Sequence, residues 1–341
     1  SNEDKKRLNS YILKEGDLAF SRVGSVDRCA IITNNEEGWL FSGRILRVRP
    51  NKSIIEPKFL MYVLKTEETK FRIRSVAVGQ TMPSLNTEIL KNFSVDISNN
   101  RQEQTKIAEF LSAVDDKISQ LSRQLELLNE YKKGVMQKIF SQEIRFKNDN
   151  GDDFGEWEEV LLNSVCDVRD GTHDSPKYVK EGYPLVTSKN LKDGKLDLTD
   201  ISLISQTDFD NINKRSKVHA GDIIFGMIGT IGNPVLLKES NFAIKNVALI
   251  KERNELLNKF LIHFLNSSLF DRQVKVLNAG NTQKFLSLNQ IRNLSVPKPT
   301  IQEQEKIAEF LTAIDEQIDH TTAQLTHTKQ WKKGLLQQMF V

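Results

Sequence analysis

The chain has 341 residues, enough for two domains with full hydrophobic cores, since single domains usually hold about 100 to 200 residues. Its two cysteines stand at unrelated positions, which excludes a disulfide framework, argues against a zinc site and fits a reducing cytoplasm. The net charge is +3 and no apolar run approaches the roughly 20 residues of a membrane span, so the sequence predicts a cytoplasmic protein.

Residues 1–100 form the first predicted globular block. The block carries 16 basic and 12 acidic side chains, an excess that is compatible with DNA contact but is also common on solvated surfaces. Short strand-like and helix-like runs alternate in it, such as "GDLAFSRVGSV" at 16–26 and "PKFLMYVL" at 57–64. The block is therefore predicted to be mixed α+β.

Residues 101–140 are predicted to form a long helix. Seven apolar residues follow one another at spacings of 4-3-4-3-4-3, which is the seam of a coiled coil: Ile107, Leu111, Val114, Ile118, Leu121, Leu125 and Leu128. Val135 and Ile139 continue this seam after Lys132. If the helix begins near the fifth residue of the stretch, it has about 35 residues and a length of roughly 50 Å.

An acidic linker at 141–156 leads into the second block, residues 157–300. Runs at 221–231, 258–265 and 279–296 repeat those of the first block, for example "GDIIFGMIGTI" and "NKFLIHFL". We expect strands at 222–225 and 247–250 and a short helix at 259–266. The upstream part of this block has no counterpart in the first.

Residues 301–341 repeat the long helix. The ungapped alignment of 101–140 with 301–340 has 19 identities in 40 positions, and "RQEQTKIAEFL" returns as "IQEQEKIAEFL". Thr321 and Thr328 weaken the second seam. Two such helices can bury their seams only against each other or against a partner. The predicted fold is therefore α+β, with two domains that are each followed by a long helix, and with the helices pairing as an antiparallel coiled coil.

Several motifs together carry a family resemblance. They are the opening "WEEVLL", the loop "DGTHDSP", "PLVTSKNL", "GDIIFGMIGTIG" and the run "GNTQKFLSLNQIRNLSVPKPTIQEQEKIAEFL" that leads into the second helix. The chain resembles the DNA-specificity (S) subunit of type I restriction-modification systems over nearly its whole length. It departs from the family pattern in lacking the upstream half of the first target-recognition domain.

The resemblance implies a non-catalytic subunit that reads a bipartite DNA target, one half with each recognition domain, while the paired helices act as a ruler. It also implies partners: modification subunits that carry S-adenosylmethionine, and a restriction subunit that carries the nuclease, ATP and Mg. This chain would then hold no cofactor or metal of its own. The alternative is a protein-binding scaffold, which the repeat alone does not exclude. An independent enzyme would need a methyltransferase motif or acidic cluster that the sequence lacks.

Base readout calls for amide, hydroxyl and basic side chains on loops. The first block offers Arg22, Ser25, Gln80 and Thr81. The second block offers a larger set, which comprises Thr172, His173, Ser175, Lys177, Ser188, Lys189, Asn190, Thr230, Asn281, Thr282, Gln283 and Lys284. The alternative for each residue is a solvated turn or a local cap, but as a set they favour DNA contact.

The helix ends raise a separate hypothesis. "YKKG" at 131–134 returns as "WKKG" at 331–334, and a glycine inside a helix costs up to about 1 kcal/mol relative to alanine, which suggests close helix approach. The resemblance implies docking of a modification subunit nearby, through Tyr131, Lys132, Lys133, Phe140, Trp331, Lys332, Lys333 and Phe340. The alternative is a frayed end with a solvated lysine pair.

Overall fold

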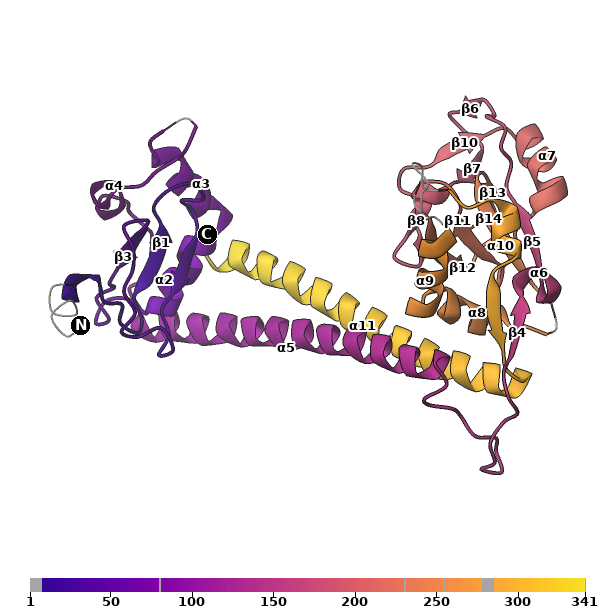
Figure 1. Cartoon of the computed structure of the whole chain (residues 1–341). Helices are drawn as coiled ribbons and strands as arrows, with labels where there is room; N and C mark the ends of the chain where they lie inside the picture. The colour runs from indigo at the N-terminus through magenta and orange to yellow at the C-terminus, as the bar shows by residue number, and fades with distance from the viewer. Residues whose placement is uncertain (1–7, 80, 230, 254, 278–284, 341) are drawn as a thin grey trace. The chain divides into compact units, whose positions relative to one another are not determined.

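The computed structural model describes residues 8–79, 81–229, 231–253, 255–277 and 285–340 (Figure 1). The chain divides into two compact units, unit 1 with Ser1–Leu125 and His320–Val341, and unit 2 with Glu126–Asp319. The two long helices, α5 (Arg101–Phe140) and α11 (Ile301–Met339), are shared, so each unit holds the beginning of one and the end of the other. The mixture of helices and strands confirms the predicted α+β class.

Unit 1 is built on a three-stranded antiparallel sheet in the order β2-β1-β3, with helix α2 packed on it. Its shorter elements are η1 (Asn9–Tyr11), β1 (Leu18–Ser21), β2 (Cys29–Ile31), β3 (Ile45–Val48), α2 (Pro57–Lys65), α3 (Glu67–Val76) and α4 (Thr87–Lys91). Helix α2 begins at Pro57, whose fixed φ suits a first helical turn. Phe20 of β1 and the apolar run 59–64 of α2 form the core.

Unit 2 contains the same framework with additional strands. Its sheets have the orders β12-β11-β14-β5, β13-β7-β10-β6, β15-β4 and β8-β9. The strands are β4 (Glu158–Leu161), β5 (Cys166–Asp170), β6 (Tyr178–Val179), β7 (Tyr183–Val186), β8 (Leu191–Lys192), β9 (Lys195–Leu196), β10 (Ser202–Ile204), β11 (Ile223–Gly226), β12 (Gly232–Leu236), β13 (Ala243–Ile244), β14 (Val247–Glu252) and β15 (Ser295–Lys298). The shorter helices are α6 (Leu162–Val165), η2 (Ser188–Asn190), α7 (Gln206–Ser216), α8 (Asn258–Leu265), α9 (Ser268–Leu277) and α10 (Leu288–Arg292).

Strand β11 separates two cores in unit 2. Successive side chains of a strand point to opposite faces, so Ile223 and Phe225 enter the core that contains α8, while Ile224 enters the core that contains Val186 of β7. Figure 1 shows β6, β7 and β10 at the end of unit 2 that lies opposite its segments of α5 and α11. These strands therefore extend the unit away from the long helices.

The internal duplication holds in three dimensions. The sheet order β2-β1-β3 of unit 1 corresponds to β12-β11-β14 of unit 2, and α2 corresponds to α8. The predicted strands at 222–225 and 247–250 and the predicted helix at 259–266 are confirmed as β11, β14 and α8, with small shifts at their ends.

Both long helices begin earlier than the fifth residue of the repeat, because each has a side-chain cap. The Oδ1 atom of Asn100 accepts the backbone N–H groups of Gln102 and Glu103 at 3.0 and 3.2 Å, and Thr300 Oγ1 accepts that of Glu303 at 3.4 Å. As a result α5 has 40 residues and α11 has 39, rather than about 35.

The predicted seam is the covered face of both helices. Every seam residue from Ile107 to Leu128 is buried or half-buried, and Thr321 is 3% exposed. The expectation of close approach at Gly134 and Gly334 is wrong, because a Cβ atom added at either glycine would meet nothing within 4 Å.

The repeated "QEQ" near the start of each long helix binds that helix to the domain that precedes it in the sequence. Gln104 Oε1 accepts the N–H of Glu56 at 2.9 Å, directly before α2, and Gln304 Oε1 accepts the N–H of Leu257 at 2.8 Å, directly before α8. Both amides are buried, at 1% and 0% exposure. Within the described ranges no helix is long and apolar enough to cross a membrane.

Candidate nucleic-acid interface

Asn246 joins three loops of unit 2 close to the β7 and β13 strands. Its side-chain Oδ1 lies 2.8 Å from Nδ1 of His173, its N–H donates to the carbonyl of Thr172 at 3.1 Å, and its carbonyl accepts the hydroxyl of Ser188 at 3.3 Å. Its φ of 55° is a left-handed conformation that asparagine tolerates better than most residues. The structure therefore brings the "DGTHDSP" and "TSKN" loops together.

Asp170, at the end of β5, binds two side chains of the same cluster. The residue is 5% exposed, and its carboxylate lies 2.8 Å from His173 Nε2 and also binds the guanidinium of Arg215. The imidazole of His173 is thus held between Asp170 and Asn246, while more than half of its side chain stays exposed. A ring that is fixed in position and open to solvent can meet a ligand without first losing conformational freedom.

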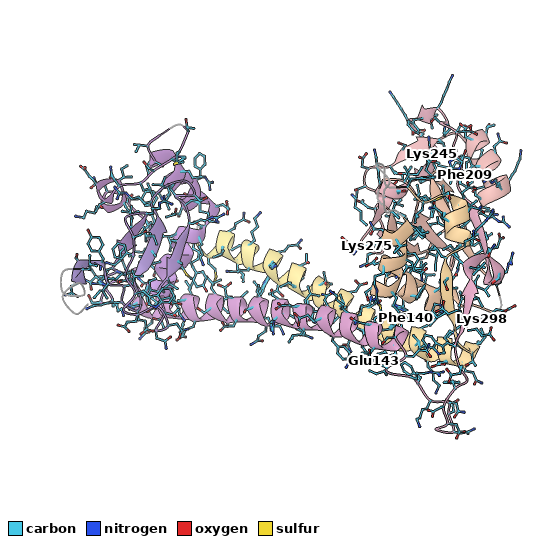
Figure 2. All side chains as sticks on the ribbon, viewed as in Figure 1. Phe140, Glu143, Phe209, Lys245, Lys275 and Lys298 are labelled. Atoms are coloured by element: carbon cyan, nitrogen blue, oxygen red, sulfur yellow. The ribbon has the colours of Figure 1, made fainter. Side chains whose placement is uncertain are left out.

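Several basic side chains lie on the segments of this cluster or next to them in the sequence. Lys245 Nζ donates to Ser175 Oγ at 2.8 Å, and Lys177, Lys189 and Arg215 are exposed. Figure 2 shows Lys245 toward the end of unit 2 that is remote from Phe140 and the helix ends. A rim of cations around hydrogen-bonding side chains suits a polyanion such as DNA.

Two of the predicted base readers have structural roles instead. Asn190 is 6% exposed, its Nδ2 donates to the carbonyl of Asp197 at 3.0 Å, and its Oδ1 accepts the N–H of Thr187. Ser188 is 7% exposed and is bonded to Asn246. The expectation that these two side chains contact DNA is corrected, because both point inward and shape the loop that presents Lys189.

A cavity of about 570 Å³ next to this loop is lined by Ser188, Asn246 and Ile228, among others. Ile228 forms a bridge with Phe285, and both side chains are 41% exposed. Five predicted readers of this region lie outside the described residues, namely Thr230, Asn281, Thr282, Gln283 and Lys284. The exposed apolar pair at their border offers the kind of contact that a thymine methyl group accepts.

Unit 1 repeats the loop pairing found beside Ile228. The N–H of Leu85 donates to the carbonyl of Arg22 at 2.8 Å, and the corresponding N–H of Leu286 in unit 2 donates to the carbonyl of Met227 at 2.9 Å. Arg22, Ser25 and Thr81 are all exposed on these loops, whereas Gln80 lies outside the described residues.

Exposed apolar side chains also flank the unit 1 loops. Val23 and Val78 are 41% and 54% exposed, and Met82 is 64% exposed. Each unit therefore presents polar and apolar side chains on paired loops, which is the mixture that base edges in the major groove require.

The predicted partner-binding residues divide into three groups. The rings of Phe140 and Phe340 pack on the chain's own Phe260 and Phe59, at centroid distances of 5.7 and 5.4 Å. Because Phe140 is only 5% exposed, it has no surface for a partner and is corrected to a core residue.

The second group, Lys132 and Lys332, forms ion pairs within the chain, with Asp315 and Asp115. The third group remains at the surface: Tyr131 and Trp331 are 54% and 47% exposed, and Lys133 and Lys333 are also exposed. Partner docking at this third group stays a prediction.

Sequence reasoning missed Asp170, Arg215, Lys245 and Asn246. One signal was available for Asn246, which directly precedes β14, as Arg44 precedes the corresponding β3 in the first block. Aligning the two blocks strand by strand would have marked both positions as loop residues at the same corner of the duplicated fold.

Comparisons with known proteins identify the family of the chain. The family model described as "Type I restriction modification DNA specificity domain" matches residues 1–130 and 155–328. The MjaVIII specificity subunit of a type I restriction enzyme from Methanocaldococcus jannaschii is 24% identical over 87% of this chain and 72% of its own length. The putative MjaX specificity subunit from the same organism is 27% identical over 96% of this chain and 78% of its own length.

Two solved structures share the fold. The S subunit of a type I restriction-modification system from M. genitalium aligns with a TM-score of 0.67 and 17% identity, over 98% of this chain and 85% of that one. A chain from a study of complex assembly and conformational transition of the type I restriction-modification system aligns with a TM-score of 0.55 and 17% identity, over 96% and 82% of the two chains.

Proposed function

Because the chain belongs to the type I restriction-modification DNA specificity family, we propose that it reads a bipartite DNA target and recruits the subunits that modify and cleave DNA. Each unit would read one half of the target through its paired loops. The chain supplies recognition and no chemistry, in keeping with relatives that are named specificity subunits.

One observation carries this proposal above the others. The same hydrogen bond between two exposed loops occurs in both units, from Leu85 to Arg22 and from Leu286 to Met227, and each unit is joined to a long helix. Since the loop sequences differ, the two units would read unlike half-sites. Alpha-helices of 39 and 40 residues are about 60 Å long, which exceeds the ~34 Å helical repeat of B-DNA.

The partners follow from the same assignment. We propose that modification subunits bring S-adenosylmethionine, and that a restriction subunit brings the nuclease together with ATP and Mg. The exposed Tyr131 and Trp331 near the helix ends are candidate docking residues, because exposed aromatic side chains are frequent anchors of protein interfaces.

Duplex binding at several salt concentrations, followed by sequencing of methylated sites, tests the proposal. The complex of this chain with its modification subunits should bind with an affinity that falls as salt rises, because phosphate contacts release counterions. It should methylate one interrupted, asymmetric motif. Full protein assembly without salt-dependent, sequence-selective DNA binding would favour the scaffold alternative.

A further inference from the structure

Each unit contains a lysine-aspartate pair between the two long helices. Lys332 Nζ donates to Asp115 Oδ1 in unit 1, and Lys132 Nζ donates to Asp315 Oδ1 in unit 2, both at 2.5 Å. The two lysines are 200 positions apart, as are the two aspartates, so this is one contact made twice. The lysine side chains are only 17% and 20% exposed.

Both lysines stand in the apolar seam. Lys132 lies four residues after Leu128 and three before Val135, so it continues the 4-3 spacing of seam positions, and Lys332 has the same place in the second helix. A lysine at a single seam position of a coiled coil is known to specify register at a cost in stability. The aspartate side chains are 37% and 40% exposed, so each pair is only partly withdrawn from solvent and acts through its geometry more than through its strength.

A third side chain completes each contact. In unit 1 the hydroxyl of Tyr62 lies 2.9 Å from Asp115 Oδ2, and Lys332 Nζ lies 5.5 Å from the centre of the tyrosine ring. In unit 2 the corresponding residue is His263, whose Nδ1 lies 3.8 Å from Asp315 Oδ2. Tyr62 belongs to α2, so its hydrogen bond also ties the unit 1 pair to that domain, whereas His263 of α8 lies beside the unit 2 pair without a hydrogen bond to Asp315.

The other contacts at the helix ends are less selective. The tips are held by ring packing, Phe340 on Phe59 and Phe140 on Phe260, and apolar contacts are non-directional. Sliding one helix by a heptad would again place apolar seam positions opposite one another, but it would carry Lys332 about 10 Å from Asp115 and leave both charges without their partner. The pair therefore distinguishes registers that the apolar seam alone leaves close in energy.

We propose that Lys132 and Lys332 are register-setting residues, which fix how the end of each long helix pairs with the other helix and so fix the length of the gap between the two half-sites. The claim that these lysines set the helix register depends on the contacts alone. The claim that the register sets the gap length rests on the proposed function.

The register is tested without DNA by electron-electron distance measurements on the full chain, with both native cysteines replaced by alanine. Spin labels at Gln120 and His327, which are exposed on the two helices of unit 1, should give one narrow distance. In K332M the distribution should broaden or gain a second distance displaced by about 10 Å. The matched control K333M, one residue away and exposed, should keep the single distance.

A swapped pair guards against simple loss of fold. In D115K/K332D the charges exchange places, and the single narrow distance should return. A single narrow distance in K332M, with the variant folded, would overturn the register assignment. The register assignment would also be overturned if D115K/K332D is folded, as shown by cooperative unfolding, but does not give the single narrow distance.

The gap is tested by sequencing the sites methylated by K132M/K332M together with the modification subunits. We expect unchanged half-sites separated by more than one gap length, whereas a merely structural role would lower activity and leave one gap. If the distance measurement shows two registers but the methylated sites keep a single unchanged gap, the register does not set the gap length. That outcome would contradict the proposal that the helices act as a ruler. The assignment of Lys132 and Lys332 to the helix register would still stand.

Discussion

Glu303 is a single buried carboxylate that holds three segments of unit 2 together. It is 0% exposed and accepts hydrogen bonds from Arg145 at 2.8 and 3.1 Å and from the indole N–H of Trp157 at 2.9 Å. The arginine reaches it from the linker and the tryptophan from the start of the recognition domain. The linker between the first helix and the second domain is therefore fastened to the beginning of α11.

Replacing Arg145 by methionine should destabilise the protein strongly. The change leaves the charge of Glu303 buried without its cation, a loss of about 3–5 kcal/mol in the free energy of unfolding. Urea unfolding of R145M and of the control K147M measures it. Lys147 pairs with Asp153 at the exposed surface, so K147M should cost about 0–1 kcal/mol, and equal losses in both variants would contradict the role given to Glu303.

His263 makes the free energy of unfolding depend on pH. Tyr62, which occupies the equivalent position in unit 1, does not titrate in the same pH range. Burial, together with the neighbouring Lys132, lowers the pKa of His263 to about 4, against the opposing effect of Asp315. The unfolded chain takes up a proton near pH 6.5 and the folded chain only near pH 4. Stability from this group is therefore complete above about pH 6.5 and is lost as the pH falls from there toward 4.

Exchange of His263 for tyrosine tests this dependence. Between pH 7 and pH 5 the wild-type chain should lose about 2 kcal/mol more than H263Y, because the tyrosine does not titrate in this range. Thermal or urea unfolding at both pH values gives the difference. An identical loss in both proteins would show that His263 already carries a proton in the folded state at pH 5.

At the residue scale, the sequence identified which loops carry polar side chains, but it did not predict which of those side chains point to solvent and which point into the protein. The loop around Lys189 was identified, but Ser188 and Asn190 turn inward because the amide of Asn190 satisfies backbone groups of its own loop. Asn246 was missed because its importance lies in partners 58 and 73 residues away. Such contacts are set by tertiary packing, which loop composition does not report.

At the scale of elements, the loops of unit 2 that we propose to contact DNA combine a ring fixed by hydrogen bonds with exposed cations. Lys177 and Lys189 are exposed on two different loops, and each is suited to a phosphate contact. Replacing either by alanine should weaken binding to all sequences alike and lower the salt slope by about 0.9 per contact removed. Titrations of a specific and a scrambled duplex at several salt concentrations measure both quantities.

The variant H173A should behave differently from these lysine variants. Because both ring nitrogens of His173 are bound, to Asp170 and to Asn246, its loss should loosen the junction of these loops and so reduce discrimination in one half-site while leaving the salt slope unchanged. An equal weakening on specific and scrambled duplexes would assign His173 to phosphate contact instead. A change in both half-sites would contradict the separate roles of the two units.

The periodicity of the long helices was readable, but their first turns were not. The 4-3 spacing gave the buried face correctly, whereas α5 and α11 start earlier than expected because Asn100 and Thr300 cap them. The additional strands β6, β7, β10 and β13 were not predicted individually, since each has only two to four residues and short runs carry little periodic signal.

At the scale of the whole molecule, the duplication was the strongest signal in the sequence, and it is present as two equivalent sheets and two equivalent helix ends. What the sequence left open was where the ends of the helices are seated. Phe340 packs on Phe59 and Phe140 on Phe260, so each helix ends against the domain that belongs to the other copy. Both repeats end in similar residues, "YKKGVMQKIF" and "WKKGLLQQMF", so their sequences alone do not assign each end to one domain.

The central claim is that the paired helices measure the distance between two half-sites, and lengthening both helices tests it most directly. Inserting one heptad after Leu121 and one after Leu325 keeps the seam in phase and adds about 10 Å, or about three base pairs at ~3.4 Å each. The same seven residues inserted after Gly151, in the exposed linker, serve as the control. Sequencing of the methylated sites should show unchanged half-sites with a gap about three base pairs longer for the helix variant and an unchanged gap for the control. An active helix variant that methylates sites with the original gap would contradict the claim.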